Sequence, residues 1–422
     1  MSRTPEPQVT APPYDPPRRP WRLGCGGFDL ADDPGLIDET IALALANDAY
    51  ERAEIAVLRA LLKPGDRLLE IGGGFGVVAL HAARILGPDN VVSYEANPQT
   101  ADAAARNFRL NAMPVRLIQA AVTAQGGDSV QYRANENFLA GSLHENVEAG
   151  RGMIEVQTVS LADALTDSRA NVILMDIEGG EAALAACDAL GPAEAVVAEI
   201  HPQILGAEGA IKAAEDFAAA GLHPRADLIH GDVYAFTRAT RHDDAARAAV
   251  AASLRAAAAH KAGDYASAAE QMRAFIDLAP GNPDAHERLT QIHLAAGNPE
   301  SASAEAEIFH RLDPANPVSS YLAGVCEMRR GHPAAAVKYA EAAIALAPAA
   351  PRYRHMACQA AHQAGMTGEA LRHAVRLAEL APYAANHIAL LQRAYRQAGL
   401  KELAAHAAGW AGALTSRASA KG

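Results

Sequence analysis

Residues 69–76 have the sequence LEIGGGFG, in which a short apolar run carrying one acid, Glu70, passes directly into a cluster of glycines. Glycine adopts backbone conformations that other residues avoid, and it lets a second segment or a ligand approach the backbone closely. The residues that follow, 75–86, have the apolar spacing of a helix. The stretch therefore predicts a strand that turns sharply into a helix, with a ligand site at the turn.

Similar apolar runs recur further along the chain and alternate with helical patterns. The predicted strands are residues 67–71, 90–94, 115–122, 171–176, 195–200 and 231–236. The predicted helices include residues 75–86, 99–110, 180–190 and 208–220. This alternation predicts a Rossmann-like α/β domain over residues 30–240, with a doubly wound, mostly parallel sheet and helices on both faces. A ligand is expected beyond the carboxyl ends of the strands.

The glycine cluster can be read in two frames. Residues 74–79, GFGVVA, fit the GxGxxA form of a dinucleotide-binding turn. If the strand ends near Ile71, the turn instead starts at Gly72, and Glu70 stands two residues before the first glycine. This second pattern, Glu-x-Gly-x-Gly-x-Gly, resembles motif I of the class I S-adenosylmethionine-dependent methyltransferases. A carboxylate here would attract the ammonium and sulfonium of that cofactor and repel a pyrophosphate. An NAD-dependent oxidoreductase is therefore kept as the less favoured alternative.

A second acid, Glu95, ends the next predicted strand about twenty residues after the glycines. A carboxylate at this place can accept hydrogen bonds from both hydroxyls of a ribose. Dehydrogenases use the same device, so Glu95 predicts an adenosine ligand without choosing between S-adenosylmethionine and NAD.

Residues 172–181, VILMDIEGGE, narrow the resemblance. An apolar strand followed by Asp-x-Glu-Gly-x-Glu resembles the hallmark of the FkbM-type methyltransferase family. Residues 95–98 (EANP), 159–163 (VSLAD) and 199–202 (EIHP) match further blocks in the family's order. The likeness covers roughly residues 50–238. The chain departs from the family at Met175, where a lysine is common.

The resemblance implies methyl transfer, mainly to hydroxyl oxygens of sugars and secondary metabolites, with S-adenosyl-L-methionine as cofactor. The acceptor would be a small molecule or a glycan. The residues expected to bind the cofactor are Glu70, Gly72, Gly74, Gly76, Glu95 and Asp176.

An alcohol is a poor nucleophile until its proton begins to leave, so a base is expected near the acceptor. Asp176, Glu178 and His201 are the candidate catalytic residues, because they stand at or just beyond the ends of two predicted strands. Asp176, Glu178 and Glu181 could also bind a divalent cation. Direct hydrogen bonding is favoured, because residues 176 and 178 of a strand point to opposite sides and Glu181 fits the dipole at a helix start. No metal site is therefore predicted.

The C-terminal third contains an internal repeat. Glycines recur every 34 residues, at Gly263, Gly297, Gly331, Gly365 and Gly399. An alanine follows each glycine by five residues, and a proline follows the first four by seventeen. The pattern resembles the tetratricopeptide repeat (TPR) and predicts an all-α solenoid of about five helical hairpins over residues 249–416. Residues 238–247 are predicted to be a linker and residues 417–422 a tail.

Repeat arrays of this type bind peptides or other domains, so a protein partner in the TPR groove is expected. The repeats would recruit the acceptor or a partner, and removing them should leave cofactor affinity nearly unchanged. The alternative from another class is a scaffold that binds S-adenosylmethionine without turnover, in which the repeats perform the function.

Composition limits the remaining possibilities. The 422 residues include 37 Lys and Arg against 49 Asp and Glu, a net charge of −12 that disfavours nonspecific nucleic-acid binding. Four cysteines without a CxxC pair predict neither a disulfide framework nor a zinc ribbon, and favour the cytoplasm. The proline-rich residues 1–29 predict a disordered arm without a targeting signal, and no segment predicts a membrane span.

Overall fold

The computed structural model describes residues 22–33, 35–133, 153–239 and 243–419. The chain divides into two compact units, with the boundary between Leu322 and Ala323. The first unit contains the predicted α/β domain and the first helices of the repeat array. None of the described helices combines the length and apolarity needed to cross a bilayer.

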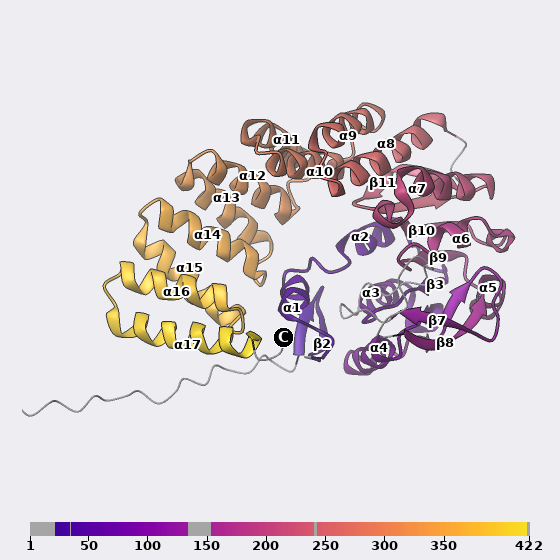
Figure 1. Cartoon of the computed structure of the whole chain (residues 1–422), viewed down its shortest axis with the longest axis horizontal. Coiled ribbons are helices and arrows are strands. Elements are labelled where there is room, and N and C mark those ends of the chain that lie inside the picture. The colour runs from indigo at the N-terminus through magenta and orange to yellow at the C-terminus, as the bar shows by residue number, and fades with distance from the viewer. Residues whose placement is uncertain (1–21, 34, 134–152, 240–242, 420–422) are drawn as a thin grey trace, which may run out of the picture. The chain divides into compact units, whose positions relative to one another are not determined.

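A seven-stranded sheet forms the centre of the first unit (Figure 1), with the strand order β11-β12-β10-β9-β3-β4-β5. Its strands are β3 (Leu68–Ile71), β4 (Val91–Tyr94), β5 (Arg116–Ile118), β9 (Val172–Met175), β10 (Ala195–Glu199), β11 (His223–His230) and β12 (Val233–Thr237). The five strands from β10 to β5 are parallel, whereas β12 runs antiparallel to both β10 and β11. The strand order reverses between β3 and β9, where a crevice is expected in such sheets.

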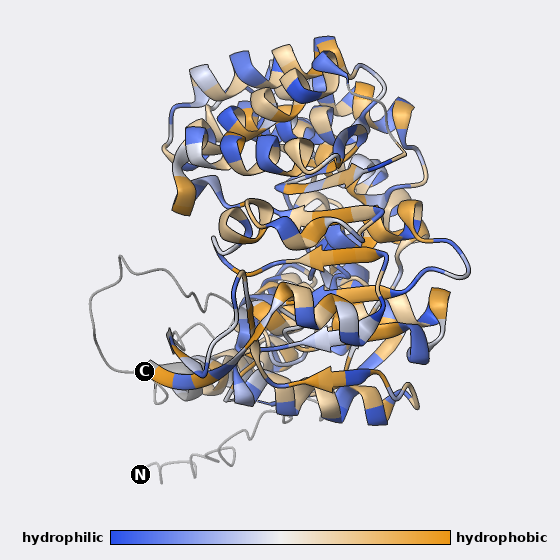
Figure 2. Ribbon diagram, turned by 90° about the vertical axis from the view of Figure 1, so that its right-hand side faces the viewer, coloured by the Kyte–Doolittle hydropathy of each residue, from blue (hydrophilic) through white to orange (hydrophobic). Residues whose placement is uncertain are grey.

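Every residue of β3, β4, β9 and β12 is buried, as expected for strands covered on both faces. Figure 2 shows apolar residues concentrated on the strands of this sheet. The helices of the α/β part are α1 (Glu39–Ala46), α2 (Arg52–Leu61), α3 (Val77–Leu86), α4 (Pro98–Leu110), α5 (Leu161–Ser168), α6 (Glu181–Ala185) and α7 (Pro202–Ala219). Three further strands form a small sheet, namely β6 (Ala121–Thr123), β7 (Ser129–Arg133) and β8 (Met153–Ser160).

The predicted doubly wound, mostly parallel sheet is confirmed, with local differences. Residues 115–122 form not one strand but two, because β5 pairs with β4 and β6 pairs with β8 of the small sheet. The prediction of β12 is confirmed within two residues at its start and one at its end. Its partner β11 was missed, as were β7 and β8, because their mixed polar and apolar residues lack a clear strand pattern.

The prediction of a disordered arm is wrong for residues 22–29. Strands β1 (Arg22–Cys25) and β2 (Phe28–Ala31) form an antiparallel hairpin. Gly26 and Gly27 both have positive φ, which suits a tight two-residue turn, and Leu23, Phe28 and Leu30 are buried. Residues 1–21 lie outside the described part of the chain.

The repeat pattern predicts the helices of the array closely. They are α8 (Asp244–Lys261), α9 (Tyr265–Leu278), α10 (Pro283–Ala295), α11 (Pro299–Leu312), α12 (Pro317–Arg329), α13 (Pro333–Leu346), α14 (Pro351–Gln363), α15 (Thr367–Leu380), α16 (Ala385–Gln397) and α17 (Lys401–Ser419). Helix α8 begins inside the predicted linker, because the Asp243 side chain accepts the N–H of Ala245 and caps the helix. Helix α17 likewise extends three residues into the predicted tail.

The five repeated glycines end the first helix of each hairpin. All five have positive φ, between 73° and 80°. At each of them the next residue donates its N–H to a carbonyl five positions back, as Asp264 does to Ala259. This arrangement satisfies carbonyls that the helix end leaves open. The alanines five residues after the glycines are at most 3% exposed, so the second helices pack closely, as the pattern predicts.

Helices α8, α9 and α10 share a hydrophobic core with the sheet. Leu254, Phe275 and Leu289 of these helices belong to the same buried cluster as Phe217 and Phe236 of the α/β part. The expectation that all repeats can be removed without effect on the cofactor site is therefore not supported for the first three helices. Their removal would expose apolar surface that the α/β part buries on folding.

The shared core predicts that a cavity in α8 weakens the sheet. Leu254 is fully buried, and Leu254→Ala is expected to lower the free energy of unfolding by about 2–5 kcal/mol. Urea denaturation would measure the loss, and amide hydrogen exchange of β12 would show whether the sheet loses protection too. Leu278→Ala is the control, because Leu278 of α9 is 40% exposed and should change stability by at most about 0.5 kcal/mol. Unchanged exchange in β12 after Leu254→Ala would contradict a common core.

Candidate functional site

A cavity of about 480 Å³ lies beyond the carboxyl ends of β3, β4, β9 and β10. It therefore occupies the point at which the strand order reverses, where ligands bind in open α/β sheets. Its lining includes the turn residues Gly72 and Gly74, the acids Glu51, Glu54, Glu95, Asp176, Glu178, Glu199 and Asp232, and one cationic side chain, Arg52. The cavity is strongly acidic.

The glycine turn brings bare backbone to the cavity. Gly72 has a φ of +92°, and a Cβ at this residue would overlap the carbonyl oxygen of Asp176. Gly74 has a φ of +49° and faces the Tyr50 hydroxyl and the Glu51 carboxylate. Gly76 has another role, because its missing side chain leaves room for the ring of Phe108 and it does not line the cavity. Gly72 and Gly74 thus remain candidate ligand contacts.

Glu95 follows β4 and holds the turn from the opposite side. Its carboxylate accepts the N–H of Gly74 at 2.7 Å and the N–H of Asn97 at 2.7 Å. Burial raises the pKa of Glu95, and these hydrogen bonds act against the rise. Each carboxylate oxygen can accept a further hydrogen bond, so the side chain can still bind hydroxyl groups in the cavity.

Glu70 lies beneath the turn and not among the residues that line the cavity. It is buried on β3, it accepts a hydrogen bond from the Ser93 hydroxyl, and it interacts with the backbone of Ala79 in α3. Burial raises the pKa of Glu70 to about 8. Direct contact of Glu70 with a cofactor amine stays a prediction, whereas its contacts support the turn from below.

His201 is surrounded by carboxylates. Its Nδ1 lies 3.2 Å from Oε1 of Glu181, a fully buried acid that also accepts the N–H groups of Ile177 and Gly179. Its Nε2 lies 3.7 Å from Asp176, 3.5 Å from Glu178 and 3.8 Å from Glu199. Burial alone would lower the pKa of His201, but the hydrogen bond with Glu181 and the nearby carboxylates raise it to about 9.

The structure contradicts the expectation that Asp176 and Glu178 point to opposite sides. Strand β9 ends at Met175, so the alternation of a strand does not reach these residues. Glu178 has a φ of +51°, a left-handed conformation that turns the chain back. Both carboxylates consequently face Nε2 of His201. Glu181 was expected only to interact favourably with the dipole at the start of a helix. Its carboxylate has a further role, because it contacts Nδ1 of His201 and orients the ring.

Asp176, Glu199 and Glu54 form a chain of neighbouring acids. Burial raises the pKa of Asp176 to about 7 and that of Glu199 well above its usual range. The pKa of Glu54 is raised as well, first by burial. The Oδ1 atom of Asp176 is buried and has no hydrogen-bond partner among the described residues. Asp176, Glu199 and Glu54 are close enough that ionisation of all three is unfavourable unless a positive charge lies nearby.

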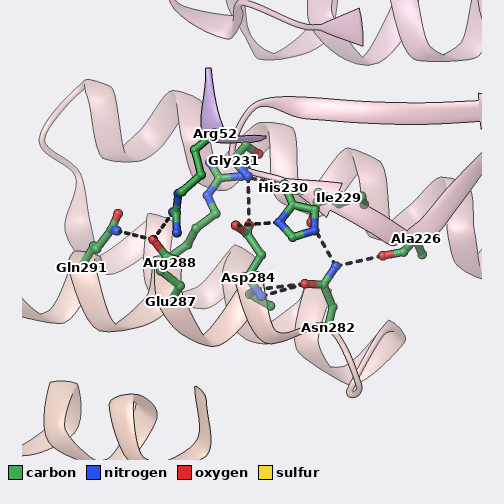
Figure 3. Close-up of polar contacts among 12 residues, drawn as sticks. Arg52, Ala226, Ile229, His230, Gly231, Asn282, Asp284, Glu287, Arg288 and Gln291 are labelled. Atoms are coloured by element: carbon green, nitrogen blue, oxygen red, sulfur yellow. Dashed lines mark hydrogen bonds and ion pairs between the residues drawn. The ribbon is translucent and has the colours of Figure 1, made fainter. Parts of the chain in front are cut away.

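Helix α10 supports one wall of the cavity (Figure 3). Arg288 donates to the carbonyl of Gly231 and, at 2.9 Å, to Asp232 in the turn between β11 and β12. Asp284 accepts the N–H of Gly231 at 3.0 Å, and Glu287 accepts from Arg52 of α2 at 2.6 Å. Arg52, Gly231 and Asp232 all line the cavity. The first repeats therefore fix two segments of the site.

Several residues of the site were not predicted. Glu199 ends a strand beside β9, so the rule that selected Asp176 could have found it. Tyr50, Glu51 and Glu54 precede the first strand of the sheet, and no motif in the sequence marks them. Asp232 comes from the turn before β12, which only the tertiary structure brings to the cavity.

Comparison with known families identifies two parts of the chain. Residues 52–144 match the family model of ribosomal protein L11 methyltransferase (PrmA), and residues 259–326 match a tetratricopeptide repeat model. Each match covers less than half of the chain. No curated protein matches the sequence. The chain thus combines a methyltransferase-like α/β domain with tetratricopeptide repeats, and the resemblance to the FkbM-type family stays a prediction.

Solved structures similar to the chain include MamA and YrrB. The chain is 18% identical to MamA over 39% of its own length and 90% of that chain, with a TM-score of 0.37. It is 15% identical to MamA from Desulfovibrio magneticus RS-1, over 40% of this chain and 96% of that chain, with a TM-score of 0.39. It is also 18% identical to YrrB, described as a TPR protein with an unusual peptide-binding site, over 40% and 86% of the two chains, with a TM-score of 0.36.

The overlap at Gly72 predicts a large effect of a single methyl group. Gly72→Ala is expected to lower the free energy of unfolding by about 2–5 kcal/mol, because backbone strain and steric overlap add. Gly65→Ala is a matched control: its φ is +97°, but a Cβ there meets nothing within 4 Å, so only about 1–2 kcal/mol should be lost. Urea denaturation of both variants would measure the difference. Equal losses would show that Asp176 does not limit the space at Gly72.

The contacts of α10 predict that Arg288 stabilises the cavity wall. Arg288→Ala leaves Asp232 and the Gly231 carbonyl without their partner and is expected to cost about 3–5 kcal/mol of unfolding free energy. Arg255→Ala provides the comparison, because Arg255 of α8 is exposed and pairs with Glu208 at 3.6 Å, and it should change stability by at most about 1 kcal/mol. Chemical denaturation would measure the free energy of unfolding of both variants. A loss from Arg288→Ala as small as that from Arg255→Ala would contradict the inference that α10 stabilises the cavity wall.

Proposed function

We propose that the protein is an S-adenosyl-L-methionine-dependent methyltransferase that methylates a hydroxyl group of a sugar, glycan or secondary metabolite. The observation that carries the proposal is the pairing of the glycine turn with Glu95 in a cavity at the reversal point of the sheet. The methyltransferase family match over residues 52–144 includes both elements. Oxygen as the methylated atom rests on the FkbM-type resemblance.

The cofactor half of the cavity lies between the glycine turn and Glu95. Backbone atoms of Gly72 and Gly74 are open to a ligand, and Glu95 can accept hydrogen bonds from ribose hydroxyls. Glu51, Glu95 and Asp176 place carboxyl groups around this half, and burial raises their pKa values. A cofactor with a sulfonium and an ammonium would favour the ionised forms of these groups, whereas the pyrophosphate of NAD would disfavour them.

The sheet also argues against a nicotinamide-dependent oxidoreductase. Dinucleotide-binding sheets of the Rossmann type have the order 3-2-1-4-5-6. Here the first five parallel strands follow this order, but the antiparallel strand β12 lies between β10 and β11. The glycine frame that starts at Gly72 is the one that faces the cavity, and Gly76 of the later frame packs against Phe108.

The acceptor half is formed by Asp176, Glu178 and Glu199 together with the α2 and β11–β12 walls. In methyl transfer the acceptor oxygen forms a bond to the methyl carbon while the carbon–sulfur bond breaks and its electron pair stays on sulfur. The hydroxyl proton must pass to a base, and we assign this role to Asp176 or Glu178, whose side chains line the cavity. His201, held by Glu181 between the acids, fits the role of a positioning residue better than that of the base. The main contribution of the site is alignment of oxygen, carbon and sulfur.

We propose that the later repeats bind a protein partner or present the acceptor, since helices α8 to α10 are already used to support the α/β part. All four cysteines are free thiols, which agrees with the cytoplasm as the proposed location. A scaffold that binds the cofactor without turnover remains the alternative, and it differs in releasing no product.

Calorimetry with the full chain tests the cofactor. S-Adenosylmethionine should bind and NAD should not. Glu95→Ala should weaken cofactor binding at least tenfold, because it removes the acceptor for Gly74 and for the ribose. Asp102→Asn, an exposed substitution on α4, should leave the affinity unchanged. Binding of NAD alone would refute the proposal.

Release of S-adenosylhomocysteine from S-adenosylmethionine in the presence of a cell extract then tests turnover. We expect release with the unaltered chain and at least a tenfold slower rate with Glu95→Ala. Cofactor binding without any release would favour the scaffold.

A further inference from the structure

Three groups of metal-ligand type meet at the ends of two neighbouring strands. Asp176 follows β9, Glu199 ends the adjacent strand β10, and His201 comes two residues later. One ligand atom from each lies within 4.8 Å of the other two, and no other such group of three was found among the described residues. The set differs from the Asp176, Glu178 and Glu181 cluster that the sequence suggested.

The separations suit one shared ion. Nε2 of His201 lies 3.7 Å from Oδ1 of Asp176 and 3.8 Å from Oε2 of Glu199. Two ligands that each lie about 2.1 Å from one octahedral ion are about 3.0 Å apart at a right angle and about 4.2 Å apart when opposite. Both distances fall inside this interval.

The histidine is held in the orientation that a ligand requires. His201 is 3% exposed, and its Nδ1 contacts Glu181, which is itself fixed by the N–H groups of Ile177 and Gly179. Metal-binding histidines commonly donate their second ring nitrogen to a carboxylate in this way. Nε2 is thereby directed at Asp176 and Glu199, at distances longer than a good hydrogen bond.

A second observation also calls for a ligand at this place. Oδ1 of Asp176 is buried and has no hydrogen-bond partner among the described residues, and the groups next to the Asp176 carboxylate are Nε2 of His201, 3.7 Å from Oδ1, and the carboxyl group of Glu199. Buried polar atoms in proteins nearly always have a partner. The arginines closest to this wall do not supply one, because Arg52 pairs with Glu287 and Arg288 pairs with Asp232. A cation between the acids would complete the site.

We propose that Asp176, Glu199 and His201 bind one divalent cation, Mg²⁺ or Mn²⁺, on the acceptor side of the cavity. Carboxylate oxygens are the preferred ligands of Mg²⁺, and Mn²⁺ also accepts an imidazole nitrogen. Binding requires Nε2 of His201 to be unprotonated, so the positive charge of the ion would replace the proton that the surrounding carboxylates favour on this histidine. The site is open toward the cavity, so coordination positions remain for water or for an acceptor.

The position of the metal site is independent of the proposed function. The chemical role of the ion rests on the proposed function, because it assumes that the acceptor is a hydroxyl group. A cation here would bind the acceptor hydroxyl and lower its pKa. The hydroxyl proton would pass to Glu178, and the oxygen would then attack the methyl carbon as the carbon–sulfur bond breaks. This arrangement reduces the need for a strong base among the acids.

Electron paramagnetic resonance of Mn²⁺ tests the site in the full chain, without cofactor or acceptor. We expect one bound Mn²⁺ per chain, displaced by Mg²⁺. Glu199→Gln and His201→Gln should each weaken Mn²⁺ binding at least tenfold. Glu194→Gln is the matched control, because Glu194 is an exposed acid next to the other end of β10 and should leave binding unchanged. No bound Mn²⁺, or equal binding by all variants, would overturn the proposal.

The unaltered chain provides a measurement that needs no substitution. If His201 is a ligand, the bound Mn²⁺ should show magnetic coupling to an imidazole ¹⁴N nucleus in pulsed experiments. Absence of this coupling from bound Mn²⁺ would exclude the site as proposed, even if the variants fail to fold.

Cofactor binding separates this inference from the proposed function. A chain that binds S-adenosylmethionine but not Mn²⁺ would lose only the metal site. A chain that binds Mn²⁺ at this site but not S-adenosylmethionine would keep the metal site and lose the proposed function.

Discussion

The close approach of the Gly72 backbone to the carbonyl of Asp176 is the constraint on which the site depends. The N–H of Asp176 also donates to the carbonyl of Ile71, so the ends of β3 and β9 are joined by backbone alone. The chain then leaves β3 in a conformation that only glycine adopts readily. This turn exposes the N–H of Gly74 to Glu95 and leaves the carboxylate of Asp176 facing the cavity. The regions proposed for the cofactor and the acceptor are consequently adjacent.

The second constraint is electrostatic. Among the described residues, seven acids and one arginine line the cavity, and the arginine, Arg52, pairs with Glu287. Burial raises the pKa values of six of the acids, Glu51, Glu54, Glu95, Asp176, Glu178 and Glu199, because it disfavours their charged forms. A ligand that brings positive charge, whether a sulfonium or a divalent cation, relieves the same imbalance. The proposed cofactor and the proposed metal ion would thus be favoured by one physical cause.

The repeats and the α/β part are not independent modules in this chain. Helices α8 to α10 complete a core that the sheet begins, and α10 holds α2 and the β11–β12 turn through Glu287 and Arg288. The first hairpins thus contribute structural elements to the α/β part. The role of a binding surface is proposed for the later hairpins alone.

The sequence by itself determined the parallel sheet, the position of the glycine turn and the ends of the repeat helices, because these depend on local patterns. Glycines that need positive φ and apolar runs of strand length are visible without any partner. Only the tertiary structure shows that Glu70 lies beneath the turn, that Glu178 turns toward His201, and that Glu199 and Asp232 join the site. Those facts depend on where separate strand ends and loops meet, and a local pattern carries no information about a neighbour distant in the chain.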